Sequence, residues 1–215
     1  GAQPLALPGY GGSAPAEGFF PAVARLAHAL PDGAVLGGWS LGALVALAIA
    51  ATAPTKVSRL ILVAGTASFV RRPGWPAGLE PAVLRQFADA VATDPGAAVA
   101  RFVKGFNHGD RRDRRVTRAL LQTADPLPPP EVLQQGLGWL ETVDLRPLLP
   151  QLTVPTLICH GAHDPLMPLA AAEALAAAVP DARLAVFADA AHAPFLSDPP
   201  AFCARIRDFI DDPSA

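Results

Sequence analysis

The chain has few of the residues on which metal centres and disulfide frameworks depend. Only two of its 215 residues are cysteine, Cys159 and Cys203, and both lie in apolar stretches where buried free thiols are expected. No HExxH or CxxC spacing occurs, so we expect no metal site. Two free thiols favour a reducing compartment, and we expect a cytoplasmic protein.

Long apolar runs are also missing. The longest, residues 41–53, is about one helix and falls short of the ~20 residues that span a bilayer. No signal peptide is visible at the start, and we expect no membrane partner. The chain contains 18 glycines and 24 prolines without a repeat, which indicates turns rather than disorder. Its 51% hydrophobic content suits one core domain with an insertion.

Strand and helix patterns alternate at both ends of the chain. Strands are expected at 5–7, 34–36, 59–65, 155–161 and 183–187, and helices at 21–30, 41–53 and 200–210. Such alternation predicts an α/β fold, with a mostly parallel sheet and helices on both of its faces.

The middle of the chain shows helical periodicity only. Helices are expected at about 80–92, 95–106, 112–124 and 130–141. We therefore divide the chain into a first core segment (1–66), a helical lid (67–149) and a second core segment (150–215). The alternative is a separate helical subdomain with no role in access to a site.

The pentapeptide Gly38-Trp39-Ser40-Leu41-Gly42 has the form G-x-S-x-G and lies between a predicted strand and helix. In that context the serine occupies a sharp turn that lifts its hydroxyl clear of the sheet. We expect both glycines to be needed, because the turn leaves no room for side chains. The backbone N–H of Leu41 would lie at the helix N-terminus, where it can stabilise an oxyanion. Ser40 is the predicted nucleophile.

A nucleophilic serine needs a base and an orienting acid, which follow it in the chain order serine, acid, histidine. Asp164 and His192 each come just after a predicted strand and are the preferred acid and base. Asp189 is the second choice of acid. The other histidines fit a base less well: His28, His108, His160 and His163.

Residues 101–118 contain seven Lys and Arg against two Asp, in a chain of net charge −2. A solvated helix face explains such a run about as well as a binding surface does. Nucleic acid fits poorly, because the whole chain is acidic and no aromatic residue interleaves the run after Phe106. An acidic protein partner or an anionic substrate fits better.

Four segments resemble the pimeloyl-acyl carrier protein methyl ester carboxylesterases of biotin synthesis, a family of the α/β-hydrolase superfamily. They are Gly38–Gly42, Ala100–Phe102, Leu140–Arg146 and Ala191–Ser197. The similarity runs from about Leu5 to Ile210. It implies the α/β-hydrolase fold, a triad of Ser40, Asp164 and His192, and no cofactor.

The same resemblance implies roles for residues around the triad. Trp39 and Phe102 match residues that line the family's acyl pocket, and Trp139 could join them. Five arginines match the lid surface that docks the acyl carrier protein: Arg101, Arg111, Arg112, Arg114 and Arg115. The family has further strands ahead of the Leu5 segment, including one that ends in a His-Gly loop with a second oxyanion donor. Position 1 is glycine, so we expect an N-terminally incomplete form.

The resulting expectation is a monomeric serine carboxylesterase that acts on the methyl ester of pimeloyl-acyl carrier protein. Two alternatives stay open. One is a general short-acyl carboxylesterase of the same superfamily. The other is a non-catalytic ligand-binding homologue, which the missing oxyanion loop suggests.

Overall fold

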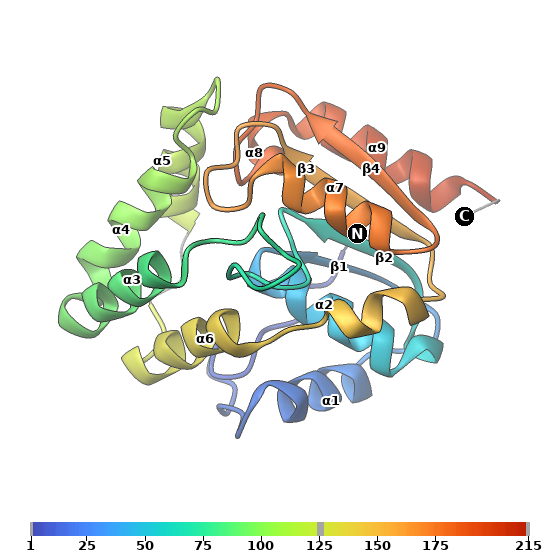
Figure 1. The fold of residues 1–215 in the computed structure, drawn as a ribbon, viewed down its shortest axis with the longest axis horizontal. Helices are drawn as coiled ribbons and strands as arrows, with labels where there is room; N and C mark the ends of the chain where they lie inside the picture. Colours follow the sequence, from blue (N-terminus) through green and yellow to red (C-terminus); the bar gives the residue numbers. More distant parts are fainter. Residues whose placement is uncertain (1, 124–126, 214–215) are drawn as a thin grey trace.

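A computed structural model describes residues 2–123 and 127–213, and Figure 1 shows a central sheet with helices around it. The strands are β1 (Ala34–Trp39), β2 (Val57–Val63), β3 (Thr156–Gly161) and β4 (Ala182–Phe187). Within the described residues they form one parallel sheet in the order β1-β2-β3-β4. All four strands therefore end at the same edge, where open parallel sheets carry their sites.

The two faces of the sheet bury different side chains, because neighbouring residues of a strand point to opposite sides. Leu60, Leu62 and Ile158 join the larger core cluster, to which α1 (Phe19–Ala29), α2 (Leu41–Thr52) and α7 (Leu169–Ala178) contribute. Ile61, Val63 and Leu157 pack on the other face with α9 (Pro199–Asp211), through its Phe209. The expectation of a parallel sheet with helices on both faces is confirmed.

Helix α2 is apolar all round, and every residue from Ala43 to Ala50 is buried. A helix of that kind belongs inside a core rather than on a surface. It packs directly on β1 and β2, and α1 packs on the side of α2 that faces away from the sheet. The start of α2, directly after Ser40, is therefore fixed by the packing of its helix against β1, β2 and α1.

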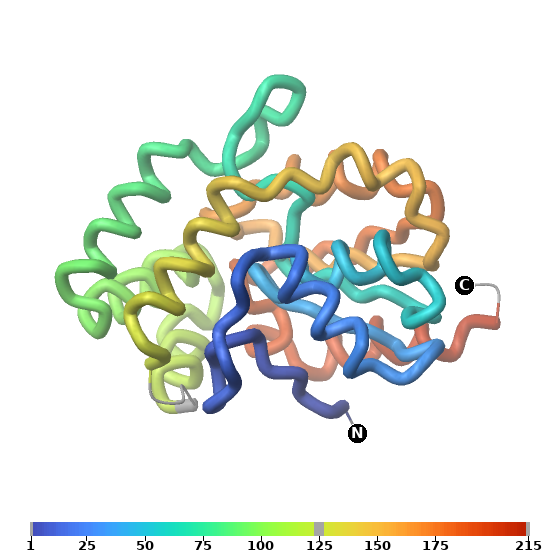
Figure 2. The backbone as a smooth tube through the Cα atoms, turned by 90° about the horizontal axis from the view of Figure 1, so that it is seen from below, coloured from blue at the N-terminus to red at the C-terminus, as the bar shows by residue number. Residues whose placement is uncertain are grey.

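Four further helices lie between β2 and β3 in the chain: α3 (Pro81–Thr93), α4 (Pro95–Phe106), α5 (Asp113–Thr123) and α6 (Pro130–Thr142). They pack on one another and gather at one end of the molecule, as both Figure 1 and Figure 2 show. Their bounds agree closely with the helices expected from periodicity. The stretch that precedes α3 contributes Phe69, Val70 and Trp75 to the main core.

Three expectations were wrong or incomplete. Leu5 to Leu7 form no strand, because the Leu7 carbonyl accepts hydrogen bonds from Tyr10 N and Ser13 Oγ in a turn. Cys203 is exposed on α9, whereas Cys159 is buried on β3, where burial raises the pKa of its thiol to about 12. Helix α7 and the short α8 (Pro194–Ser197) were not foreseen.

Gly161 ends β3 and lets another segment come close. A Cβ at this position would lie 1.9 Å from the carbonyl oxygen of Ala191. We predict that Gly161→Ala lowers the free energy of unfolding by about 1–3 kcal/mol or more, because backbone must move to make room. Gly138→Ala is the matched control in α6, where a Cβ meets nothing within 4 Å beyond the backbone of its own helix. It should stabilise the protein by about 0.5–1 kcal/mol. Urea unfolding curves compare the two, and equal effects would contradict the close approach.

Candidate active site

Ser40 occupies a strained turn between β1 and α2. Its backbone has φ 54° and ψ −117°, a conformation that non-glycine residues adopt at a cost of about 1–3 kcal/mol. The turn is held by Ser40 N, which donates to Val63 O at 3.0 Å, and by Ser40 O, which accepts from Ala43 N and Leu44 N. The surrounding fold thus keeps the serine in the geometry expected of a nucleophile.

The two glycines of the pentapeptide are not equivalent. A Cβ at Gly38 would lie 2.2 Å from Gly42 O, so this position requires glycine. A Cβ at Gly42 meets nothing within 4 Å beyond the backbone of its own helix, and the expectation that both glycines are needed was wrong. Leu41 begins α2, so its N–H has no acceptor in a preceding helical turn and is available to a ligand.

Asp164 and His192 are joined by a hydrogen bond of 2.7 Å between Oδ2 and Nδ1. Asp164 follows β3, His192 follows β4, and both are buried, with His192 only 1% exposed. The other carboxylate oxygen, Oδ1, accepts from Leu166 N and Met167 N. A carboxylate accepts only, so Nδ1 carries the proton and Nε2 of neutral His192 is left free to take one.

Aromatic side chains frame the imidazole. The His192 ring lies 5.6 Å from the Trp39 ring and 5.0 Å from the Phe106 ring, centroid to centroid. Trp39 Nε1 also donates to the His192 carbonyl at 2.8 Å. Trp39 directly precedes Ser40, so this bond ties the histidine segment to the serine turn. No hydrogen bond joins Ser40 Oγ to His192 within residues 2–123 and 127–213, and such bonds often form only once substrate binds.

His160 is a buried neighbour of the acid and not a competing base. Its Nε2 lies 2.8 Å from the carbonyl oxygen of Met167. A carbonyl oxygen only accepts hydrogen bonds, so Nε2 must carry the proton of the neutral ring. Burial lowers the pKa of His160 and keeps the ring neutral, although the Asp164 carboxylate works in the opposite direction. A neutral His160 leaves the Asp164 charge available to His192.

An apolar cavity of about 520 Å³ lies beside the serine turn, between the sheet edge and the four-helix layer. Trp39 and Leu41, on either side of Ser40, line it, and so does Phe102 from α4. The other lining residues are mostly apolar and include Phe87, Val91, Val99, Val103, Phe106, Leu120, Leu133, Leu137 and Leu140. This volume and lining suit a small apolar ligand group.

Other predicted positions lie elsewhere. Trp139 is outside the cavity and packs edge-on against Phe19 at 5.7 Å in the core, so its expected place in the pocket was wrong. Asp189 is largely exposed and pairs with Arg111 at 3.3 Å instead of His192. His28, His108 and His163 are exposed and take no part in the Asp164–His192 pair.

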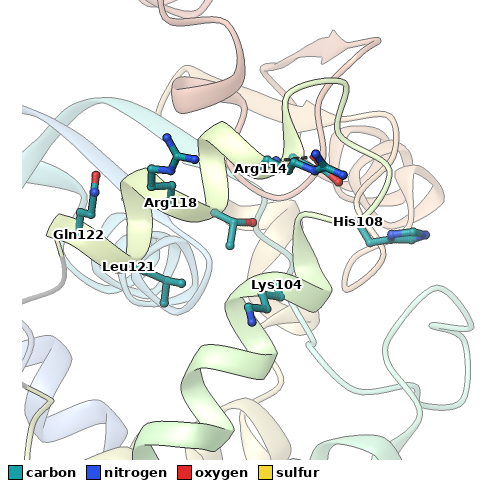
Figure 3. Close-up of a pocket in the computed structure, with 8 residues that line it drawn as sticks. Lys104, His108, Arg114, Arg118, Leu121 and Gln122 are labelled. Carbon is teal, nitrogen blue, oxygen red and sulfur yellow. Dashed lines mark hydrogen bonds between the residues drawn. The ribbon is translucent and has the colours of Figure 1, made fainter.

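The five selected arginines separate into two groups. Arg111 pairs with Asp189, Arg112 donates to Ser197 O, and Arg115 donates to Leu196 O and Ser197 O. Arg101 and Arg114 are exposed, and their side chains make no hydrogen bond or ion pair with another described residue. Arg114 lines a second, basic cavity of about 500 Å³, with Lys104 on α4 and Arg118 on α5, as Figure 3 shows.

Sequence reasoning missed the role of Asp110, which was counted only as a charge. It is 5% exposed and accepts a hydrogen bond from Ala191 N, next to His192. The available signal was an acid that directly follows Gly109 in an arginine-rich stretch. In the described ranges no cluster of His, Cys, Asp or Glu could hold a metal ion, and no helix there is long and apolar enough to cross a bilayer.

Comparison with known proteins gives consistent matches. The family model for the alpha/beta hydrolase fold matches residues 7–199. The chain is 45% identical to the pimeloyl-[acyl-carrier protein] methyl ester esterase of Aromatoleum aromaticum, over 95% of this chain and 85% of that protein. The Vibrio parahaemolyticus protein of the same name is 39% identical over 96% and 82%.

Solved structures agree on the fold. An esterase from Exiguobacterium antarcticum superposes with a TM-score of 0.83 at 24% identity, covering 96% of this chain and 80% of that one. A thermophilic esterase from Thermogutta terrifontis gives 0.78 at 27% identity, over 95% and 77%.

The geometry predicts that Ser40 is the residue modified by a fluorophosphonate probe. Ser40→Ala should abolish labelling, and His192→Ala should slow it by about 100-fold or more, because the base acts as a unit with the nucleophile. Asp189→Ala should label at the wild-type rate, since Asp189 contacts Arg111 and not His192. Mass spectrometry of the labelled peptide checks the site, and labelling that persists in Ser40→Ala would overturn the assignment.

Proposed function

We propose that this chain is a serine esterase that hydrolyses the methyl ester of pimeloyl-[acyl-carrier protein]. It belongs to the α/β-hydrolase fold family and, within it, to the pimeloyl-[acyl-carrier protein] methyl ester esterases. The observation that carries the proposal is the buried Asp164–His192 pair together with the strained Ser40 turn, whose neighbours Trp39 and Leu41 line an apolar cavity. Relatives at 45% and 39% identity support the choice of substrate.

The reaction follows from the proton positions. His192 Nε2 takes the Ser40 proton as Oγ attacks the ester carbonyl, and the Leu41 N–H stabilises the oxyanion. His192 then protonates the departing methoxide, so methanol leaves and Ser40 holds the acyl group. Water, deprotonated by His192, then attacks the acyl-enzyme. His192 returns this proton to Ser40 Oγ as the bond to the acyl group breaks, which releases the free carboxylate and restores the serine. Asp164 keeps the proton on Nδ1 and stabilises the imidazolium formed in each step. These groups complete the reaction without a cofactor.

The cavity suits the acyl chain. Trp39 and Phe102 supply aromatic walls, and the other lining residues are mostly aliphatic, so the methylene chain of a pimeloyl group can be buried there. The helical layer covers this cavity, and we assign residues 67–149 as a lid between the core segments 1–66 and 150–215.

The acyl carrier protein would dock on the basic surface of the lid, for which we keep Arg101, Arg111, Arg112, Arg114 and Arg115. Arg101 and Arg114, together with Lys104 and Arg118, have side chains free to meet an acidic partner. Arg111, Arg112 and Arg115 also bond to residues 189–197, the segment that contains His192. We also propose that the protein acts as a monomer, because no triad group has to come from a second chain. The two free cysteines fit a cytoplasmic site of action.

Three substrates separate this function from its alternatives: the carrier-linked methyl ester, the free dimethyl ester of pimelate and a short p-nitrophenyl ester. A higher kcat/KM on the carrier-linked ester is expected. Equal kcat/KM on all three would favour a general short-acyl carboxylesterase. Reversible binding of the esters with no turnover would favour a non-catalytic homologue.

Charge reversal should isolate the docking surface. The double variant Arg114→Glu/Arg118→Glu should lower kcat/KM on the carrier-linked ester by about 10-fold at low salt, because steering depends on local charge. Turnover of the free ester should stay unchanged, since neither side chain lines the acyl cavity. Arg207→Glu, on exposed α9 away from the lid, is the control with the same type of charge change.

Two results would contradict docking of the carrier protein on Arg114 and Arg118. Equal losses on carrier-linked and free esters would show damage to the lid instead of lost docking. A carrier-linked rate that does not respond to the double reversal would place the carrier elsewhere. Arg112→Glu should reduce both rates, because Arg112 donates to Ser197 O, in the segment that follows His192.

A further inference from the structure

Asp110 lies in the turn between α4 and α5 and binds the segment that carries the base. Its Oδ2 accepts from Ala191 N at 3.0 Å, and its Oδ1 accepts from Ser197 Oγ at 2.9 Å. Oδ1 also accepts from Arg112 N at 2.7 Å, within its own turn. Two of these three donors therefore flank His192, one residue before it and five after it.

The carboxylate is buried and makes no ion pair with any described residue. A buried carboxylate is stabilised only when donors surround it, and hydrogen bonds to a charged acceptor are about twice as strong as neutral ones. The donors and the charge thus stabilise each other. Removing Asp110 would leave the Ala191 N–H without an acceptor, at a residue that is itself fully buried.

The turn between α4 and α5 also contacts the segment that contains His192, residues 189–197, at further points. Arg111 N donates to Asp189 O at 2.9 Å, ahead of His192. Arg115 donates to Leu196 O and Ser197 O, behind it. From the opposite side, Gly161 permits contact between the end of β3 and Ala191. Ala191 is therefore fixed between the sheet and the lid, and Asp110 supplies the lid's hydrogen bond to it.

We propose that Asp110 is a positioning residue for the hydrolysis. Its carboxylate holds Ala191 N and Ser197 Oγ so that the His192 imidazole stays where it can take the Ser40 proton. This role rests on the proposed serine-esterase function. It acts through the placement of His192 and not through contact with the substrate, because Asp110 does not line the acyl cavity.

The test uses Asp110→Ala and the near-isosteric Asp110→Asn. A displacement of about 1 Å at the reacting groups can slow a reaction about 100-fold. We expect Asp110→Ala to lower both kcat and the rate of fluorophosphonate labelling of Ser40 by about 10- to 100-fold. KM should change less than about twofold, since the cavity is untouched. Asp110→Asn should fall in between, because its one uncharged amide oxygen can accept at only one of the two oxygen positions of Asp110.

Asp94→Ala is the matched control. Asp94 is another lid acid, and its Oδ1 caps α4 by accepting from Ala97 N, far from His192 in the chain. It should lower Tm by about 2–4 °C, the effect of one lost cap in a domain of this size, and leave the labelling rate unchanged. A lower Tm for Asp110→Ala with wild-type labelling and kcat would overturn the proposal in favour of a purely structural role.

Two further measurements separate positioning from general damage. The downfield proton resonance of His192 Nδ1–H should shift or broaden in Asp110→Ala but not in Asp94→Ala. In a His192→Ala background, adding Asp110→Ala should lower the residual labelling rate no further, because the group it positions is gone. A further loss there would contradict a role through His192.

If Asp110→Ala does not fold, Asp110→Asn and Ser197→Ala carry the test. Ser197→Ala removes one donor to Asp110 and should slow labelling by a few fold. Wild-type labelling rates in both variants would overturn the proposal. A loss confined to the carrier-linked ester would do so as well, since it would make Asp110 a docking residue. Rapid labelling of wild-type Ser40 without hydrolysis of any ester would refute the proposed function and still leave positioning measurable.

Discussion

The hydrogen bond between Asp164 Oδ2 and His192 Nδ1 is the interaction on which the rest of the site depends. It sets the tautomer of the imidazole and leaves Nε2 as an acceptor. It can form because β3 and β4 are adjacent and parallel, so the loops after them begin at the same edge. Ser40 follows β1, which lies two strands from β3 and three from β4, so the segment that contains His192 must extend back along that edge.

Because the segment that contains His192 extends this far, several contacts are needed to hold it in place. Gly161 has no side chain and lets Ala191 lie close to the end of β3. Trp39 holds the His192 carbonyl beside the serine turn. Asp110 and the neighbouring arginines hold the same segment from the lid. The base is therefore located by three parts of the fold that are distant in sequence.

The sequence was sufficient where local pattern decides structure. Periodicity located the strands and most helices, because burial of one face forces apolar residues to recur with the period of the element. The serine turn was recognisable from five adjacent residues, and Asp164 and His192 from their places after strands. Trp39 and Phe102 came from family resemblance, and both line the cavity.

Features that depend on distant partners were not predictable. Nothing local marks Asp110 as the acceptor of Ala191 N, or separates Arg112, bonded to Ser197 O, from Arg114, whose side chain is free. Trp139 fits a pocket as well as a core by composition, and its contact with Phe19 decides the matter. Leu5 to Leu7 have the composition of a strand, but the Leu7 carbonyl is used in a turn.

The arginines of the lid turn also constrain how this protein can diverge. Arg112 and Arg115 donate to carbonyls at the end of α8, so replacing either one would disturb the chain that follows His192, whichever partner is bound. Arg101 and Arg114 carry no such bond and can change with little effect on the chemistry. Under the proposed function, partner preference can therefore change at one set of positions while the other set keeps the support of the His192 segment, although both sets belong to one run of positive charge.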